Sequence, residues 1–140
     1  MTTEPASGPR PLPLVEEHLA LLDLWARYCS HLDHGDIDAY IELFTPDAVY
    51  EVYGRAFEGH GGLRKMMRGA PHGLHLGGPP VIEMIDDVTA HTTHNLYFVP
   101  VGDEPRRALY RGEMRKTTEG WRIARWRCEF ITSEGVQDRP

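Results

Sequence analysis

Asp33 is the residue whose position in this sequence most strongly suggests chemistry. It follows apolar residues at helical spacing and continues one row of the predicted helix. The members of that row are Val15, Leu19, Leu22, Ala26, Cys29 and Asp33. A carboxylate on an inward-facing row predicts a group that orients or holds a proton inside the fold. The alternative is that Asp33 ends the helix by bonding the turn "HGD", a common use of aspartate.

Tyrosine hydroxyls are the second set of candidate groups. Tyr28 lies five residues before Asp33, about 140° around an ideal helix, so the two converge only across a pocket mouth or through a loosened last turn. A phenol there would donate a hydrogen bond to a substrate oxygen as charge develops on it, and the alternative is a core tyrosine. Tyr50 and Tyr53 lie on opposite faces of a predicted strand, so only one is expected to point inward. Tyr110 is a further candidate for substrate binding.

Basic and metal-binding groups give weaker signals. Arg125 or Arg127 would supply a cation to a carboxylated or thioester-bearing substrate. The sequence offers paired histidines in "HGLH" and "HTTH". His91 and His94 would point to opposite faces of a strand, and "HGLH" has no third ligand at regular spacing, so no metal site is predicted.

Two helices must come first in the fold to position these groups. Apolar residues from Leu14 to Leu32 recur by threes and fours, which predicts an amphipathic helix. Gly35 is expected to end it, and Asp36 to cap a second, short helix that stops at "TPD". The inner face of that short helix would carry Ile37, Tyr40, Ile41 and Phe44.

A meander of strands is expected to follow the helices. The segment "AVYEVYG" predicts a first strand, and "EGHGGLRKMMR" a short helix. Four long antiparallel strands are then predicted from "LHLGGPPVIEMI", "VTAHTTHNLYFVPV", "RRALYRGEMRKT" and "WRIARWRCEFIT", which are separated by turn-forming residues. Helices followed by strands indicate an α+β domain in which a curved sheet wraps the long helix.

Composition limits the remaining possibilities. The chain has 140 residues, of which 41% are hydrophobic, so a single domain over residues 14–132 is expected, with a disordered N-terminal tail at 1–13 and a C-terminal tail at 133–140. The formal charge of -6, with scattered basic residues, argues against nucleic acid as a partner.

The absence of a signal peptide and of a long apolar run predicts a cytoplasmic protein with no membrane partner. Cys29 and Cys128 have apolar or aromatic neighbours, which suits buried thiols in a reducing compartment.

The order of these motifs resembles a known family. The segments "YCSHLDHGDIDAYIELFTPDAVYEV", "FEGHGGLRKMM" and "EGWRIARWR", with a histidine before a proline-rich strand start, are similar to the SnoaL-like group of the NTF2-like superfamily over residues 14 to 131. The resemblance implies a cone in which a strongly curved mixed or antiparallel sheet and a few helices enclose an apolar pocket, commonly in homodimers. The superfamily includes scytalone dehydratase, bile-acid 7α-dehydratase, steroid Δ-isomerase, polyketide cyclases and the β subunits of ring-hydroxylating dioxygenases.

The resemblance also implies roles for single residues. Dehydratases of this family pair an aspartate, here Asp33, with a histidine from a strand that lines the same pocket, and His75 in "GLHLGGPP" matches that histidine. Bile-acid 7α-dehydratase has a tyrosine and an aspartate at the separation of Tyr28 and Asp33. The family's acidic residue two positions after the tyrosine of strand four is replaced by Gly112, and the site aspartate of steroid isomerase has no clear counterpart. The residues alone leave open that His75 is one loop histidine among eight.

The function expected from this reading is a cofactor-free lyase or isomerase of dehydratase type. It would act on a small apolar, cyclic hydroxy-carbonyl compound, with His75 as a base oriented by Asp33. The alternatives are a polyketide-cyclase or steroid-isomerase-like enzyme, or a non-catalytic binding or assembly module like the dioxygenase β subunits. A homodimer through the sheet is expected, because Tyr97, Trp121 and Trp126 are bulky candidates for its outer face.

Overall fold

The computed structural model describes residues 15–132 and 135–137, and the predicted N-terminal tail lies outside them. The helices are α1 (Val15–His34), α2 (Ile37–Ile41) and α3 (Gly59–Arg68). The strands are β1 (Phe44–Val52), β2 (Arg55–Glu58), β3 (Gly73–Gly77), β4 (Val81–Met84), β5 (Thr89–Pro100), β6 (Arg106–Thr117), β7 (Gly120–Thr132) and β8 (Gly135–Gln137). The short strand β8 lies within the predicted C-terminal tail and pairs with β7.

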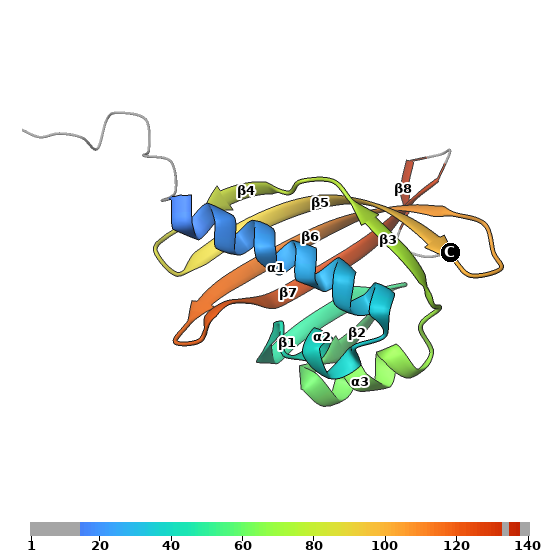
Figure 1. The fold of residues 1–140 in the computed structure, drawn as a ribbon, viewed down its shortest axis with the longest axis horizontal. Coiled ribbons are helices and arrows are strands. Elements are labelled where there is room, and N and C mark those ends of the chain that lie inside the picture. The colour runs from blue at the N-terminus through green and yellow to red at the C-terminus, as the bar shows by residue number, and fades with distance from the viewer. Residues whose placement is uncertain (1–14, 133–134, 138–140) are drawn as a thin grey trace, which may run out of the picture.

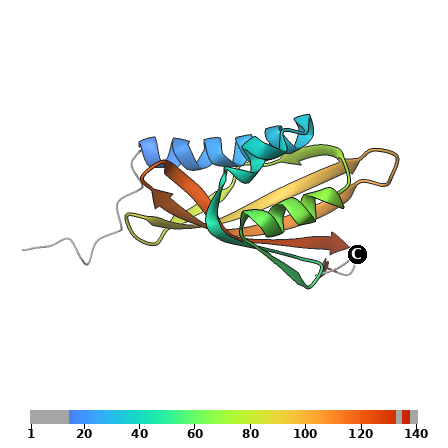
Figure 2. The same cartoon turned by 90° about the horizontal axis from the view of Figure 1, so that it is seen from below.

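The eight strands form one mixed sheet, in agreement with the predicted α+β class. The strand order is β2-β1-β7-β6-β5-β3, with β4 also on β5 and β8 on β7. Strands β1 and β7 run parallel, whereas the other pairs are antiparallel. Figures 1 and 2 show α1 along one face of the curved sheet, with α2 and α3 beside its C-terminal end and near β1 and β2.

The end of α1 is fixed by a glycine, as predicted. Gly35 has a φ of 70°. Its N–H donates to the Leu32 carbonyl, and the Asp36 N–H donates to the His31 carbonyl, which is the Schellman pattern. Asp36 then caps α2, because its carboxylate accepts from the Ala39 N–H at 3.3 Å. This tight connection sets where Asp33 lies relative to the sheet.

Three details of the predicted helices and strands were wrong. Phe44 and "TPD" belong to β1 rather than to the short helix, which ends at Ile41. The first strand is followed at once by β2, so the two form a hairpin. The predicted strand "LHLGGPPVIEMI" is divided into β3 and β4, because Pro79 and Pro80 have no N–H to donate to a ladder.

The face of α1 that packs on the sheet differs from the predicted row. Leu21, Leu24, Trp25 and Tyr28 are buried, whereas Val15 and Leu19 are 69% and 58% exposed. The row that contains Asp33 is therefore the flank of the helix rather than the centre of its buried face. That flank lies beside β3, from which His75 comes.

The outer surface of the sheet is less aromatic than predicted. Trp121 and Trp126 are buried on the helix side, where the Trp121 indole donates to Glu17 and Trp126 packs against Trp25. Only Tyr97 of the three residues is exposed. The homodimer therefore stays a prediction, and Tyr97 alone of these residues supports it.

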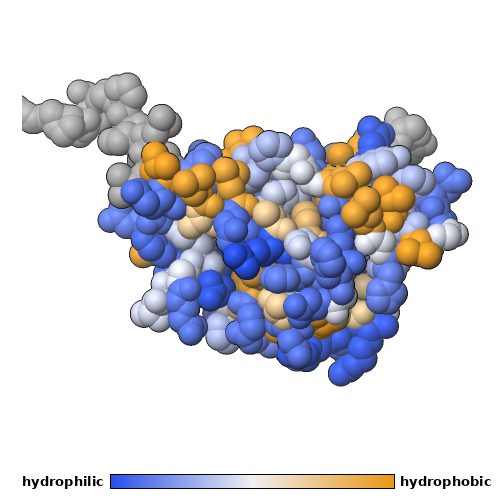
Figure 3. Space-filling model, viewed as in Figure 1, coloured by the Kyte–Doolittle hydropathy of each residue, from blue (hydrophilic) through white to orange (hydrophobic). Residues whose placement is uncertain are grey.

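The hydrophobic surface on the face that carries α1 is not continuous. Figure 3 shows its hydrophobic groups separated by hydrophilic residues, with one group over the start of α1 and another near the opposite end of the molecule. In the described part of the chain no helix is long and apolar enough to cross a bilayer.

Gly77 is expected to be essential for seating Trp25 on the sheet. A Cβ at Gly77 would lie 2.3 Å from the Trp25 ring, whereas nothing lies within 4 Å of a Cβ at the adjacent Gly78. The Trp25 indole also donates to the Gly78 carbonyl at 2.9 Å, so the ring has little freedom to move away. Gly77→Ala should lower the free energy of unfolding by about 1–3 kcal/mol. Urea unfolding beside Gly78→Ala measures this, and equal stabilities of the two variants would contradict it.

Candidate active site

A cavity of about 400 Å³ lies between the helices and the sheet. Most of its wall is apolar, with side chains such as Leu32, Val52, Phe57, Met66 and Leu96. The hydroxyl-bearing and imidazole side chains on the wall are Tyr28, Tyr40, Tyr50, Tyr53, Tyr110, His72 and His75. The cone is therefore open enough to admit a small molecule, and it brings polar groups from distant parts of the chain to one apolar space.

Asp33 is in direct contact with His75, which lines this cavity, but Asp33 itself is not among the lining residues. One Asp33 carboxylate oxygen lies 2.8 Å from His75 Nδ1 and also accepts from the His75 backbone N–H at 2.8 Å. Asp33 does not cap the helix, because Gly35 and Asp36 make the capping bonds. The side chains of His75 and Asp33 are 12% and 17% exposed, so both are shielded from bulk water but remain reachable.

The contact fixes the chemical form of the imidazole. A carboxylate only accepts hydrogen bonds, so His75 Nδ1 carries the proton and Nε2 is left as the basic nitrogen. Burial lowers the pKa of His75, while the hydrogen bond and the negative charge of Asp33 oppose that effect. The imidazole is consequently neutral at pH 7. Asp33 also lies in the last turn of α1, where the helix dipole does not favour an anion, so its position is not explained by helix stability.

Tyrosine hydroxyls meet deeper in the cavity. The Tyr28 and Tyr50 oxygens are 2.9 Å apart, and the Trp126 indole N–H donates to the Tyr28 oxygen at 3.1 Å. Burial raises the pKa values of Tyr28 and Tyr50 well above 10, so both phenols keep their protons at neutral pH. The hydroxyl groups of Tyr40 and Tyr110 also interact with this pair, so the four phenols form one buried cluster at the cavity.

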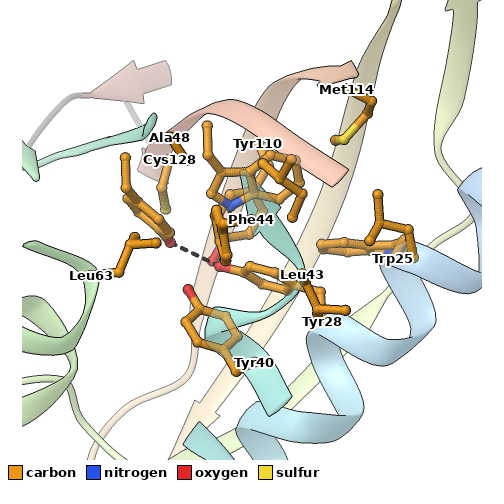
Figure 4. Close-up of a cluster of buried hydrophobic side chains, with 14 of the residues drawn as sticks. Trp25, Tyr28, Tyr40, Leu43, Phe44, Ala48, Leu63, Tyr110, Met114 and Cys128 are labelled. Carbon is orange, nitrogen blue, oxygen red and sulfur yellow. Dashed lines mark hydrogen bonds between the residues drawn. The ribbon is translucent and has the colours of Figure 1, made fainter. Parts of the chain in front are cut away.

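Tyr40 was placed on the inner face of α2 by the sequence but was not recognised as a site residue. Its hydroxyl is directed toward the Tyr28 hydroxyl (Figure 4). Although this oxygen is buried, it makes no hydrogen bond of standard geometry to the described residues. Its interaction with the Tyr28 hydroxyl lies outside standard hydrogen-bond geometry, so this buried hydroxyl keeps capacity to bond a ligand. Tyr40 thus joins Tyr28 and Tyr50 as a candidate donor.

Tyr50 and Tyr53 both line the cavity, so the expectation that only one would do so was wrong. Strand β1 ends at Val52, and Tyr53 has a φ of 55°, which no longer follows the alternation of a strand. With Gly54, at a φ of 68°, it forms the two-residue turn of the β1–β2 hairpin. Tyr110 also lines the cavity and is buried.

Arg127 is not among the residues that line the cavity. It lies 3.5 Å from Glu51 and 3.2 Å from Glu129, and Arg125 also approaches Glu51, at 3.9 Å. These arginines border a separate hollow on the other side of the sheet. The basic side chains at the main cavity are instead Arg55, Lys65 and Arg106, none of which the sequence reading selected.

Of the paired histidines, His72 and His75 line the cavity and His91 and His94 do not, and Cys128 is the cysteine on the cavity wall. Cys29 and Cys128 are both free, and burial raises the pKa of each thiol to about 12. Both are therefore protonated and weakly nucleophilic at neutral pH. Within residues 15–132 and 135–137, no three His, Cys, Asp or Glu side chains gather closely enough to hold a metal ion.

Comparison with known proteins identifies the family. The model of the SnoaL-like domain matches residues 13–127. No curated protein sequence matches the chain significantly.

Solved structures share the fold along nearly the whole chain. A proposed aromatic ring hydroxylase from Novosphingobium aromaticivorans is 26% identical, with a TM-score of 0.75 over 87% of this chain and 93% of its own. An NTF2-like protein with a cystatin-like fold from the same species is 24% identical, with a TM-score of 0.73 over 86% and 85%. Hexachlorocyclohexane dehydrochlorinase LinA-type3 from Novosphingobium barchaimii is 16% identical, with a TM-score of 0.76 over 84% and 88%. The chain belongs to the SnoaL-like domain family and has the NTF2-like fold.

Proposed function

We propose that the protein is a lyase or isomerase that removes a proton from carbon in a small apolar, cyclic hydroxy-carbonyl compound. The observation that carries the proposal is the 2.8 Å contact of Asp33 with His75, whose side chain lines an apolar cavity. A base held in one tautomer, with its other nitrogen not bonded to Asp33, is suited to proton transfer near neutral pH. An assembly module with a filled cone would need neither the cavity nor this pair.

The proposed reaction begins when His75 Nε2 takes the proton from the carbon next to the carbonyl group. The electron pair of the broken C–H bond moves toward the carbonyl oxygen, and the resulting enolate is stabilised by a hydrogen bond from the tyrosine hydroxyls. The carboxylate of Asp33 stabilises the positive charge on the imidazolium. Buried donors aimed at a developing oxyanion contribute strongly in a site from which water is excluded.

The second step distinguishes a dehydratase from an isomerase. In the dehydratase version, the enolate electrons re-form the carbonyl group and make a C=C bond as the β-hydroxyl group leaves. That hydroxyl group takes the proton from the imidazolium and departs as water. In the isomerase version, the imidazolium returns the proton to a different carbon of the same compound. The dehydrochlorinase among the similar structures supports elimination as the reaction class.

A generic carbon acid tests the proposed base without knowledge of the natural substrate. Removal of one C–H proton from 5-nitrobenzisoxazole opens its ring and releases a coloured phenolate, and the compound is small enough for a cavity of about 400 Å³. The protein should accelerate this ring opening with saturation kinetics. Acceleration no greater than that of an equal concentration of free imidazole would contradict the proposal.

The pH dependence of this reaction should follow the deprotonation of His75. Because burial lowers the pKa of His75 below its ordinary value of 6.5, the neutral base persists to more acidic pH than free imidazole. Below the pKa of His75 in the folded protein, kcat/KM should fall about tenfold per pH unit, and above it kcat/KM should be level. Initial rates between pH 4.5 and 8.5 measure this profile. A midpoint above 7 would contradict the assignment.

A further inference from the structure

Arg106 stands out among the residues that line the cavity. The cavity is bordered by Arg55, Lys65 and Arg106, but by no aspartate or glutamate among the described residues. This bias is opposite to that of the whole chain, whose formal charge is -6. Arg55 lies over the Phe57 ring at 5.2 Å, whereas Arg106 is held by a hydrogen bond and by two aromatic rings.

The contacts of Arg106 with the described residues use little of its hydrogen-bonding capacity. Its Nη1 donates to the Tyr53 hydroxyl at 2.9 Å, and its guanidinium carbon lies 5.6 Å and 5.4 Å from the ring centres of Phe98 and Phe130. No carboxylate among the described residues forms an ion pair with it. A guanidinium group has five N–H donors in a planar fork that matches a carboxylate, and among the described residues Arg106 makes one hydrogen bond.

Tyr53 is the residue that orients this cation, and it does so from an unusual backbone conformation. A positive φ is uncommon for a residue other than glycine, and in an aromatic residue it stores strain. The Tyr53 ring stacks on Phe130, with centroids 5.1 Å apart and planes at 12°, which places the hydroxyl against Arg106. The hairpin turn thus positions a cation at the cavity rather than merely reversing the chain.

Sheet register relates Arg106 to the proposed base. His75 is directly opposite Phe98, and Phe98 is directly opposite Arg106, so the three share one face across β3, β5 and β6. Two strand spacings separate the backbones of His75 and Arg106 by about 10 Å. The Phe98 ring lies between them, 4.7 Å from the His75 ring and 5.6 Å from the guanidinium carbon. A flat apolar ring laid on Phe98 would have the base at one end and the cation at the other.

We propose that Arg106 binds a carboxylate of the substrate, so that the protein acts on apolar ring compounds whose acidic group lies about one to two ring widths from the carbon that loses its proton. The position of that carbon rests on the proposed function, but the binding of the anion by Arg106 does not. Lys65 and Arg55 add to the positive potential around the cavity and favour entry of an anion.

Two probes of nearly equal shape test the proposal by binding alone. 2-Naphthoate carries a carboxylate where 2-naphthamide carries a neutral amide, and titration calorimetry at pH 8 and low salt measures both affinities. The wild-type protein should bind naphthoate about tenfold more tightly, as a charge-assisted bond to arginine would give. Arg106→Gln should remove this preference and leave the affinity for naphthamide within about threefold. Arg107→Gln is the matched control, since its exposed side chain lies on the opposite face of the same strand.

Further variants make the outcomes decisive. Tyr53→Phe removes only the hydroxyl that orients Arg106, so it should reduce the preference for naphthoate without abolishing it, and circular dichroism verifies that each variant is folded. His75→Gln should keep the preference while losing base activity, which separates failure of the anion site from failure of the proposed reaction. Equal wild-type affinities, no binding of either probe, or a preference that survives Arg106→Gln would each overturn the proposal. Loss of the preference in Lys65→Gln with retention in Arg106→Gln would also overturn it.

Discussion

Replacing His75 with glutamine is expected to lower the rate of proton removal by about 10²- to 10⁴-fold, the usual contribution of a positioned general base. Glutamine retains an N–H that can donate to Asp33, but it has no nitrogen that is basic at neutral pH. The loss should therefore appear in kcat for ring opening of 5-nitrobenzisoxazole, while the affinity of the cavity for neutral aromatic ligands changes little. Stopped-flow absorbance and calorimetry measure the two effects separately.

The matched control for this variant is His91→Gln, because His91 is exposed on the outer side of the sheet, near Glu113. It should leave both the rate and the ligand affinity unchanged. A His75→Gln protein that is folded and still opens the ring at more than a tenth of the wild-type rate would show that His75 is not the base. In that case the imidazole would serve only to hold Asp33 at the end of α1.

Asp33→Asn should lower kcat by about 10²-fold and displace the acidic limb of the pH profile to lower pH. Both effects have one cause, since the carboxylate favours the protonated imidazole and raises the pKa of His75 against burial. An asparagine oxygen still accepts from the His75 backbone N–H, so thermal stability should change by much less than activity does. Rates measured across pH, together with thermal unfolding followed by circular dichroism, determine both quantities.

Asp36→Asn is the matched control for Asp33, because it makes the same chemical change three residues away. Asparagine is as good an N-cap as aspartate, so this variant should retain its activity and stability. The opposite pattern at Asp33, a sharp loss of thermal stability with surviving turnover, would mark Asp33 as a structural residue only.

The contact between Asp33 and His75 could be predicted because two independent signals agree. The helical spacing of Asp33 with apolar residues indicated a functional carboxylate, and the family resemblance selected His75 from eight histidines. The row itself was misplaced, since apolar residues near the start of α1 are exposed and the buried face is centred on Leu24, Trp25 and Tyr28. The long helix extends past the edge of its core, so apolar spacing alone does not reveal which residues find a partner.

The predictions that failed depend on features that alternation along a strand cannot reveal. Tyr53 lines the cavity because the strand has ended and its φ is positive. Arg127 faces the outer glutamates, because sequence gives the alternation of a strand without saying which of its faces is inward. Arg106 and Tyr40 were not selected, since their importance comes from register across several strands and from a buried hydroxyl that keeps capacity to bond a ligand. These properties exist only in the assembled sheet.

The place of β7 in the sheet also determines when the molecule can be completed during synthesis. β7 is made late but lies between β1 and β6, and Tyr50 must pair with Trp126 across about half of the chain length. The β1–β2 hairpin therefore has no neighbour on its inner edge until residues 120–132 have left the ribosome, and pairings between such distant segments form slowly. During that interval the apolar faces of α1 and β1 lack their β7 neighbours and are only partly covered, which makes the nascent chain prone to aggregation. Because the cavity takes wall residues from Tyr28 to Phe130, it forms only in the final stage of folding, and a bound ligand stabilises the last step rather than the first.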